Sequence, residues 1–145
     1  MPTRRPDIEL LGRVPLFDGL SRALLGRVAA LTEEITYNAG RVIVEKDTPG
    51  RAFYVIVDGM ARVVKGQIVT ARREAELGPG DFFGELALLD GERRAATVIA
   101  TTDLTTIRIE RTDFRRLLRE EPELALKLLE GMARRTRRIL DAPSL

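Results

Sequence analysis

The sequence predicts a mainly β fold, a jelly roll or barrel, with helices at both ends of the chain. Between residues 34 and 110, short runs rich in β-branched residues are separated by glycine and proline turns. These runs show no fixed-period repeat and are not separated by crossover helices. Many short strands joined by such turns in a small domain are typical of jelly rolls and barrels rather than of parallel sheets.

The whole chain is expected to form one domain, residues 1–145. A length of 145 residues with 44% hydrophobic residues suits a single core. A chain of this size buries enough surface to fold without disulfides, and the sequence contains no cysteine. A reducing, cytoplasmic setting is therefore expected.

N-terminal helices are expected over residues 7–31. Residues 7–13 have weak helical character, and Ser21 is placed to cap a helix that reaches about Leu31. The apolar residues of this helix recur at helical spacing, at Leu24, Leu25, Val28 and Leu31.

The β region, residues 34–110, is expected to contain strands at 41–45, 52–57, 61–64, 68–77, 96–101 and 104–109. Turns are expected where glycine, proline, asparagine and aspartate cluster, at 38–40, 48–50, 58–59 and 78–80.

The pattern returns to helix over residues 112–140. Thr112 is placed to cap a helix through about Arg119, and Pro122 suits the first turn of a longer helix to about Leu140. One mostly apolar stripe of the longer helix contains Ala125, Leu128, Leu129, Met132, Thr136 and Ile139. The stripe alone is compatible with packing against the barrel, with a dimer seam or with a lid over a ligand.

Composition excludes several classes of function. Histidine and cysteine are both absent, which removes Ser-His-Asp hydrolysis, thiol nucleophiles and histidine-ligated metal chemistry. The net charge is +2, and residues 111–140 carry nine basic and five acidic residues. A basic helix face is more often solvated than bound to nucleic acid, so direct nucleic-acid binding is not expected. No apolar run approaches the length of a membrane span or signal core.

The most informative stretch is residues 80–98, GDFFGELALLDGERRAATV. Gly84 allows close backbone approach at the start of a short helix, whose free N–H groups can hold an anion such as phosphate. Arg94 is expected to enter the next strand beside small residues, and its guanidinium can grip two phosphate oxygens. The carboxylate of Glu85 would accept a hydrogen bond from a ligand hydroxyl while an arginine holds the carboxylate in place. The alternative is a simple Glu85–Arg94 surface pair, worth about 0–1 kcal/mol.

Residues 83–89 and 94–98 closely resemble the phosphate-binding cassette of cyclic-nucleotide-binding domains. The similarity continues, in the family's order and spacing, at residues 16–21, 39–40, 47–50, 53–59 and 78–83. Such domains occur in bacterial catabolite activators, in regulatory subunits of cAMP-dependent protein kinase and in cyclic-nucleotide-gated channels. The resemblance implies a double-stranded β-helix jelly-roll barrel with N-terminal helices and C-terminal hinge and lid helices, and it places the phosphate-binding cassette at residues 83–98.

The resemblance also implies a ligand site made of Phe83, Gly84, Glu85, Leu86, Ala87, Arg94, Ala95, Ala96 and Arg135. Arg94 would neutralise the cyclic phosphate, Glu85 would accept from the ribose 2′-hydroxyl, and the amides of Gly84 and Ala96 would line the site. Ala95 stands where cGMP-selective kinases of the family carry a hydroxyl residue, which favours cAMP over cGMP. Cyclic dinucleotides, or no ligand, remain as alternatives.

The last helix is expected to act as a lid. Residues 132–135 resemble the catabolite activator helix, which would bring Arg135 toward the ligand, although Ile139 and Leu140 replace hydroxyl residues of that family. The hinge would be residues 112–119 with Phe114 as its buried anchor. Ligand would draw this hinge inward, and the last helix would close over the base or rearrange a dimer interface.

The sequence therefore predicts a cyclic nucleotide sensor without catalytic, metal or cofactor sites. The alternative is the ligand-binding part of a catabolite-activator-type transcription regulator, in which a DNA-binding domain would follow the long helix, and no such domain lies before Leu145. The lack of histidine, cysteine and a second domain argues against an enzyme. A homodimer through the last helix is expected, and the downstream effector stays open between a kinase, an acyltransferase, a channel and a cyclase.

Overall fold

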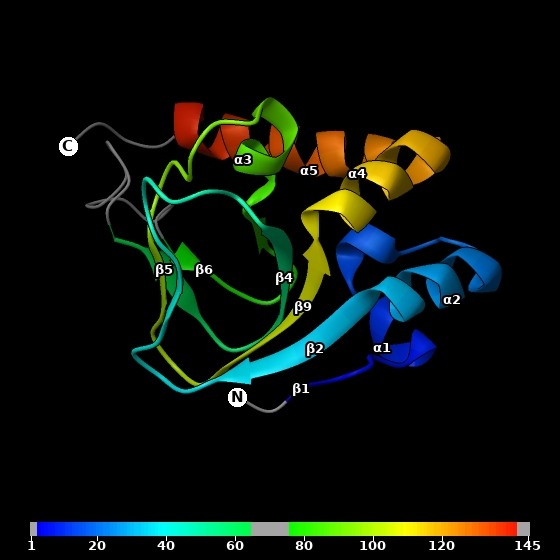
Figure 1. Ribbon diagram of the computed structural model, residues 1–145, viewed down its shortest axis with the longest axis horizontal. Coiled ribbons are helices and arrows are strands. Elements are labelled where there is room, and N and C mark those ends of the chain that lie inside the picture. The colour runs from blue at the N-terminus through cyan, green and yellow to red at the C-terminus, as the bar shows by residue number, and fades with distance from the viewer. Residues whose placement is uncertain (1–2, 65–75, 142–145) are drawn as a thin grey trace.

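Two antiparallel sheets pack face to face in the computed structural model, which describes residues 3–64 and 76–141 (Figure 1). The first sheet has the strand order β1, β2, β9, β4, β7 (Thr3–Arg4, Thr32–Tyr37, Leu104–Glu110, Ala52–Asp58, Phe82–Phe83). The second has the order β3, β8, β5, β6 (Val42–Val44, Val98–Ala100, Ala61–Val63, Glu76–Leu77). This arrangement confirms the expected jelly roll.

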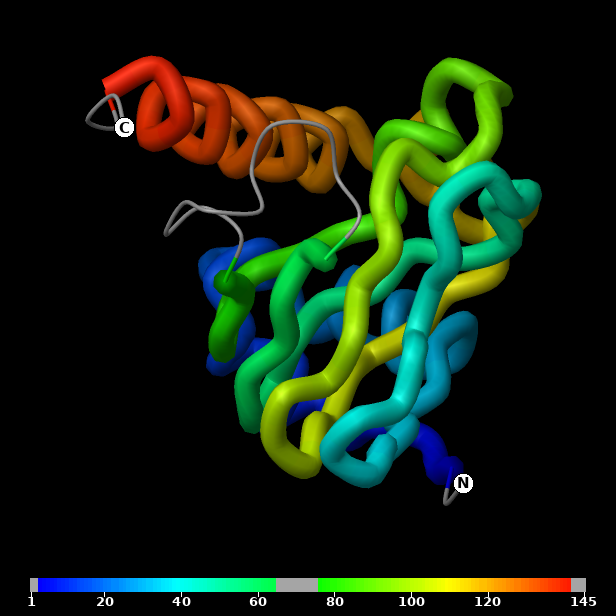
Figure 2. The backbone as a smooth tube through the Cα atoms, turned by 90° about the vertical axis from the view of Figure 1, so that its left-hand side faces the viewer, coloured from blue at the N-terminus to red at the C-terminus, as the bar shows by residue number. Residues whose placement is uncertain are grey.

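The helices gather outside the first sheet and at one end of it. They are α1 (Ile8–Gly12), the 3-10 helix η1 (Pro15–Phe17), α2 (Arg22–Leu31), α3 (Glu85–Asp90), α4 (Arg111–Glu120) and α5 (Pro122–Asp141). In Figure 2, α5 crosses the end of the sheets that lies away from the N-terminus. The N-terminal and C-terminal helices therefore share one side of the molecule.

Strand β4 is buried on both faces, because it separates two apolar cores. Tyr54 and Ile56 point into the core between the sheets. Phe53 and Val55 point into a second core beneath the helices, where Phe53 stacks on Phe114 of α4 with ring centroids 4.5 Å apart. The alternation of side chains along a strand thus explains why residues 52–57 form a continuous apolar run.

The expected helix signals are largely confirmed. Ser21 caps α2 as expected, by accepting from the amide of Leu24 at 3.1 Å. Asp7, which was not expected to act as a cap, caps α1 by accepting from the amide of Leu10 at 2.7 Å. Helix α5 begins at Pro122 as expected. Thr112, however, does not cap α4, because β9 runs directly into a helix that begins at Arg111 and has Glu110 at its N-cap.

The strands agree with the expected runs within a few residues, with exceptions. Strands β1, β2 and β7 and helix η1 were not among the expected elements, and the β region begins at Thr32 rather than at residue 34. Of the expected strand 68–77, residues 68–75 lie outside the described part of the chain. Only its end is seen, as β6.

The buried face of α5 differs from the expected stripe. Leu128 is buried as expected, but Leu129 is 59% exposed and Thr136 is also exposed. Ala125, Met132 and Ile139 of the expected stripe are partly buried. The packed face also includes Leu124, Gly131 and the partly buried Arg135. A stripe chosen by hydropathy therefore finds only part of this face, because the face includes a glycine and an arginine.

Within residues 3–64 and 76–141, no helix combines the length and apolar character needed to cross a membrane.

Candidate functional site

Gly84 lies at the turn between β7 and α3 with a φ of 93°, in the left-handed region that glycine adopts without strain. A Cβ at this position would lie 2.6 Å from Nη1 of Arg94 and 3.0 Å from the carbonyl oxygen of Ala52. The glycine therefore allows the backbone to approach a guanidinium closely.

The Arg94 side chain is held beneath this turn. Arg94 is only 5% exposed, and its guanidinium donates to the carbonyl oxygens of Gly84 at 3.0 Å and Ala52 at 2.8 Å. Burial lowers the pKa of Arg94 from its ordinary value, an effect that Tyr54 and Glu85 oppose. No carboxylate of the described residues forms an ion pair with it. A buried cation held by neutral acceptors is costly unless an anion comes to it.

One expectation about Arg94 is wrong, and the alternative of a surface pair is not found. It does not enter the next strand, because β8 begins at Val98 and residues 94–97 form an irregular segment. The amide of Arg94 instead donates to Thr48 at 2.7 Å, which ties this segment to the loop before β4. Nor does Arg94 pair with Glu85 at the surface, since both residues are buried and Glu85 has another partner.

Glu85 is paired with Arg135 of α5. Its Oε2 accepts from Nη2 of Arg135, while its Oε1 is buried without a hydrogen-bond partner among the described residues. Arg135 also donates from Nη1 to the carbonyl oxygen of Phe82 at 2.9 Å, and its guanidinium carbon lies 5.0 Å from the centre of the Phe82 ring. The last helix is thus docked on the cassette through Arg135.

These groups surround a hollow of about 190 Å³, here called the cassette hollow. All nine residues expected in the ligand site line it: Phe83, Gly84, Glu85, Leu86, Ala87, Arg94, Ala95, Ala96 and Arg135. The structure therefore brings together residues that are far apart in the sequence. Arg94 and Arg135, for example, are separated by 41 positions.

Five further residues line the cassette hollow and were not expected in the site: Val44, Val63, Leu77, Val98 and Ile139. They add an apolar wall opposite the charged groups. In the sequence, the strand residues among them are indistinguishable from core residues. Ile139 carried the only signal, since it occupies a position at which the catabolite activator helix has hydroxyl residues.

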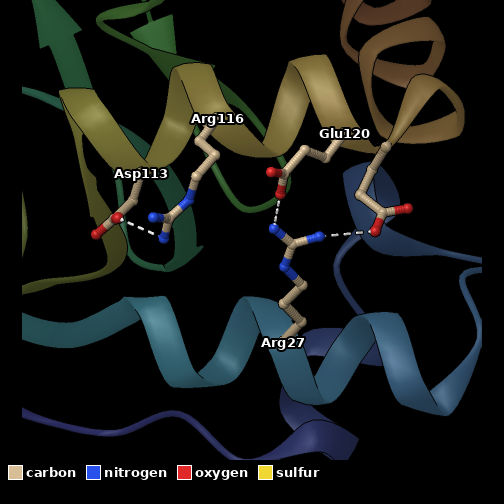
Figure 3. Close-up of polar contacts among 5 residues, drawn as sticks. Arg27, Asp113, Arg116 and Glu120 are labelled. Atoms are coloured by element: carbon tan, nitrogen blue, oxygen red, sulfur yellow. Dashed lines mark hydrogen bonds and ion pairs between the residues drawn. The ribbon is translucent and has the colours of Figure 1, made fainter.

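Polar contacts connect α4 to α3 of the cassette and to the N-terminal helix α2. Arg115 of α4 donates to the carbonyl oxygen of Leu88 in α3 at 2.7 Å. On the other side of α4, Arg27 of α2 is paired with Glu120 and, at 2.9 Å, with Glu121 (Figure 3). Helix α4 is therefore linked both to the cassette and to α2.

No group of three or more histidine, cysteine, aspartate or glutamate side chains within residues 3–64 and 76–141 is arranged to hold a metal ion. The charged groups that line the cassette hollow are instead two guanidinium groups, which donate hydrogen bonds, and one carboxylate, which accepts them. This set suits an organic anion that also carries a hydroxyl group.

Sequence comparison finds relatives among cyclic nucleotide receptors. A cAMP-dependent protein kinase regulatory subunit of Aspergillus fumigatus is 41% identical over 119 residues, which cover 79% of this chain and 27% of that protein. A cyclic nucleotide-gated potassium channel of Mesorhizobium japonicum is 38% identical over 117 residues, which cover 81% of this chain and 31% of the channel. The chain thus spans roughly a quarter to a third of the length of these curated relatives.

Solved structures show the same fold. The catabolite activator protein of Thermus thermophilus has 32% sequence identity and a TM-score of 0.72, over 86% of this chain and 59% of that protein. A cyclic nucleotide-binding protein of Geobacter metallireducens, at 19% identity, supports the fold alone, with a TM-score of 0.75.

The sequence profile described as "Cyclic nucleotide-binding domain" matches residues 34–121, which is more than half of the chain and includes the whole cassette. The profile match agrees with the two-sheet fold and with the relatives above. The chain belongs to the cyclic nucleotide-binding domain family.

Proposed function

We propose that this chain is a cytoplasmic sensor that binds cAMP in the cassette hollow and in response stabilises α5 in its docked position. The observation that carries the proposal is Arg94, a buried guanidinium with two neutral acceptors and no ion-pair partner among the described residues. An anionic phosphate would supply the missing counter-charge.

The remaining residues of the hollow suit the other parts of the ligand. The buried Oε1 of Glu85 has no partner among the described residues, and a ribose 2′-hydroxyl would donate to it. The amides of Gly84 and Ala96 would complete the phosphate site, and Leu86 and Ala87 would shape it. In this proposal Arg135, rather than the phosphate-binding Arg94, positions the Glu85 carboxylate for the ribose hydroxyl.

Base recognition would be mainly apolar. Ala95 offers no hydroxyl to the amino group of guanine, and the wall formed by Val63, Leu77 and Ile139 offers no polar side chain. This favours adenine over guanine because a buried guanine amino group without a partner costs binding energy. A cAMP-bound relative supports the ligand class: a structure titled "cAMP bound PfPKA-R (141-441)" matches this chain with a TM-score of 0.74 and 26% identity.

Ligand would act through α5 because this helix supplies part of the hollow. Arg135 and Ile139 line the cassette hollow only while α5 is docked. A ligand that contacts them binds the docked form better than an undocked one, and such differential affinity is what shifts a conformational equilibrium. Arg115, through its contact with Leu88, would transmit movement of α3 to the hinge.

The test is calorimetric titration with cAMP and, separately, with cGMP. We expect cAMP to bind more tightly than cGMP. Replacement of Arg94 by alanine should weaken the binding of cAMP by about 2–5 kcal/mol, because the phosphate loses its buried charge partner. Glu85→Ala should weaken the binding of cAMP more than the binding of 2′-deoxy-cAMP, because the deoxy nucleotide lacks the hydroxyl that Glu85 would accept from. Wild-type affinity in Arg94→Ala, or no heat from either nucleotide with folded protein, would contradict the proposal.

We limit the proposed function to sensing. Relatives that contain this kind of domain include kinase regulatory subunits, a potassium channel and a catabolite activator, so the domain alone is compatible with different outputs. The described residues carry no feature that favours the transcription-regulator alternative over the others.

A homodimer through α5 is a second proposal, supported by the exposed side of this helix. Leu126, Leu129 and Leu140 are 57%, 59% and 76% exposed. With Ala133 and Thr136 they recur at alternating intervals of three and four residues, the spacing of a two-helix seam. A second copy of the chain would bury all three leucines against their own counterparts.

Light scattering tests the dimer. Wild-type protein at tens of micromolar should have twice the monomer mass, and Leu126→Glu together with Leu129→Glu should return it to the monomer mass because the seam would become charged. Leu89→Glu is the matched control, because Leu89 of α3 is 39% exposed and lies outside the seam, and it should leave the mass unchanged. A monomeric wild type would reject the seam.

A further inference from the structure

A second hollow lies beside the cassette hollow and is larger, about 340 Å³ against about 190 Å³. It is bounded by η1, by the turn at residues 78–82 and by the middle of α5, and we call it the α5 groove. Its volume is in the range typical of small-molecule sites. Of the residues proposed above to contact the nucleotide, Arg135 and Leu77 line both hollows, and the others lie outside the α5 groove.

The helix wall of the α5 groove is strongly basic. Lys127, Arg134 and Arg138 are spaced by seven and then four residues, so that they lie on one face of α5. None of the three forms an ion pair with another residue in the described part of the chain. Glu130 is the one carboxylate on this wall, and Asp81 on the opposite side already accepts from the amide of Gly78 at 2.8 Å.

The opposite wall is largely apolar and rigid. It contains Pro15 and Leu16 of η1, Leu77 of β6 and Pro79 of the turn. The two walls together suit a ligand with an apolar or ring portion next to a negative charge. Guanidinium groups bind phosphate through paired hydrogen bonds, so phosphate is the anion that this wall fits best.

We propose that the α5 groove is a second ligand site, which binds a small organic phosphate with its ring or apolar part against Pro15 and Pro79 and its phosphate against Lys127, Arg134 and Arg138.

The two sites would be coupled through α5; this part of the inference rests on the proposed function. Both hollows lose a wall if α5 leaves its docked position, and Arg135 lines both. A ligand in either hollow therefore favours the docked helix. By linkage, each ligand increases the affinity for the other by the same factor.

The first experiment uses phenyl phosphate as the probe and follows backbone amides by NMR during titration of the full chain. Saturable shifts are expected at Gly80 and Gly131, which line the groove, and these are distinct from shifts at Gly84 and Ala96 in the cassette hollow. Inorganic phosphate, which lacks the ring, should bind several-fold more weakly at the groove. Equal affinity for inorganic phosphate, or no shift at Gly80 and Gly131, would overturn the proposal.

Charge variants make the test independent of folding. The triple variant Lys127→Gln, Arg134→Gln, Arg138→Gln should bind phenyl phosphate about tenfold or more weakly. Glu130→Gln should bind it more tightly, since the repelling carboxylate is removed, and a gain cannot come from unfolding. Arg137→Gln, at an exposed arginine of α5 that does not line the groove, is the matched control and should not change the affinity. Unchanged affinity in the triple and Glu130→Gln variants would reject the site.

The second experiment measures the cAMP dissociation constant with and without phenyl phosphate. Wild type should bind cAMP several-fold more tightly when the groove is filled, and the triple variant should not. The difference between the two proteins isolates the groove from any competition in the cassette hollow. An equal effect in both would overturn the coupling. If neither protein binds cAMP, the proposed function fails, while the NMR titration still decides whether the groove is a site.

Discussion

Arg94 and Glu85 are two buried charged residues with different kinds of partner. Glu85 has a charged partner in Arg135, whereas among the described residues Arg94 has only the carbonyl oxygens of Gly84 and Ala52 as partners. An unpaired buried charge costs more than a paired one. The site is therefore arranged so that the cation, rather than the carboxylate, gains most from an anionic ligand.

Replacing Arg135 by methionine should lower the free energy of unfolding by about 1–3 kcal/mol, because a buried carboxylate and the Phe82 carbonyl each lose a donor. Methionine keeps an apolar contact with the Phe82 ring, so the change reports mainly on the polar partners. Urea denaturation measures the effect. Arg137→Met, on the exposed side of the same helix, should differ little from wild type, and an equal loss in both variants would contradict the assigned role of Arg135.

Gly131 should resist substitution even though it lies inside a helix. An added Cβ would lie 2.6 Å from Cε2 of Phe82, so α5 would have to move away from the cassette. Overpacking costs about 1–3 kcal/mol, which exceeds the gain of about 1 kcal/mol in helix propensity. Gly131→Ala should therefore lower both the urea midpoint and the affinity for cAMP.

Gly26 is the matched control for this prediction. It lies inside α2, and a Cβ there would meet only Cδ1 of Ile8, at an ordinary 3.8 Å. Gly26→Ala should raise the free energy of unfolding by up to about 1 kcal/mol. A stabilising effect at both glycines would mean that α5 is not held tightly against Phe82.

At the scale of elements, Arg27 of α2 adds a polar link to the junction of α4 and α5. Arg27 lies between the carboxylates of Glu120 and Glu121 (Figure 3). The hydrogen bond from Arg27 holds the pKa of the Glu120 carboxyl below its ordinary value of 4.5. Since the pair is exposed, it contributes modestly and depends on salt.

The sign of the pH dependence follows from this lowered pKa. Glu120 binds a proton less readily in the folded chain than in the unfolded one, so its contribution to stability is present above about pH 4.5 and is lost as the pH falls through the folded pKa. Arg27→Gln should therefore have a lower urea midpoint than wild type at pH 7, and the gap should close toward about pH 3.

Arg22→Gln provides the comparison, because Arg22 of α2 makes only a 3.8 Å contact with Glu9 and both side chains are mostly exposed. Its midpoint should match wild type at both pH values. A gap for Arg27→Gln that is the same at pH 7 and at about pH 3 would show that the ion pair is not its source.

At the scale of the whole molecule, a ligand that binds only the folded chain raises its thermal stability. At a cAMP concentration about 100 times the dissociation constant, the gain is about 2.7 kcal/mol. For a domain of this size we expect a rise of roughly 5–10 °C in Tm. Differential scanning calorimetry measures it; Arg94→Ala should show no rise, and an equal rise in the variant would place the ligand elsewhere.

The fold followed largely from local signals in the chain. The cap at Ser21, the proline at the start of α5 and the glycine turns between strands all act through neighbouring backbone, and the structure confirms them. Where an element is set by its partners, local signals failed: β7 and β1 are two residues each and exist because they pair with β4 and β2. The helix start expected at Thr112 was wrong because β9 continues into α4 at Arg111, and the N-cap residue Glu110 makes no side-chain capping hydrogen bond.

The sequence by itself determined the fold class and the cassette residues of the hollow, because the cassette is a continuous stretch whose glycine, carboxylate and arginine carry the chemistry locally, whereas the strand residues of the apolar wall were missed. Only the tertiary structure decided how the charges are paired. In the folded chain Glu85 pairs with Arg135, 50 residues away, and Arg94 donates to backbone carbonyl oxygens. Helix α5 is oriented so that Gly131 and Arg135 face the cassette. The physical reason is that a helix docks by the shape and polar partners of the surface beneath it, and these are assembled from strands and loops far away in the sequence.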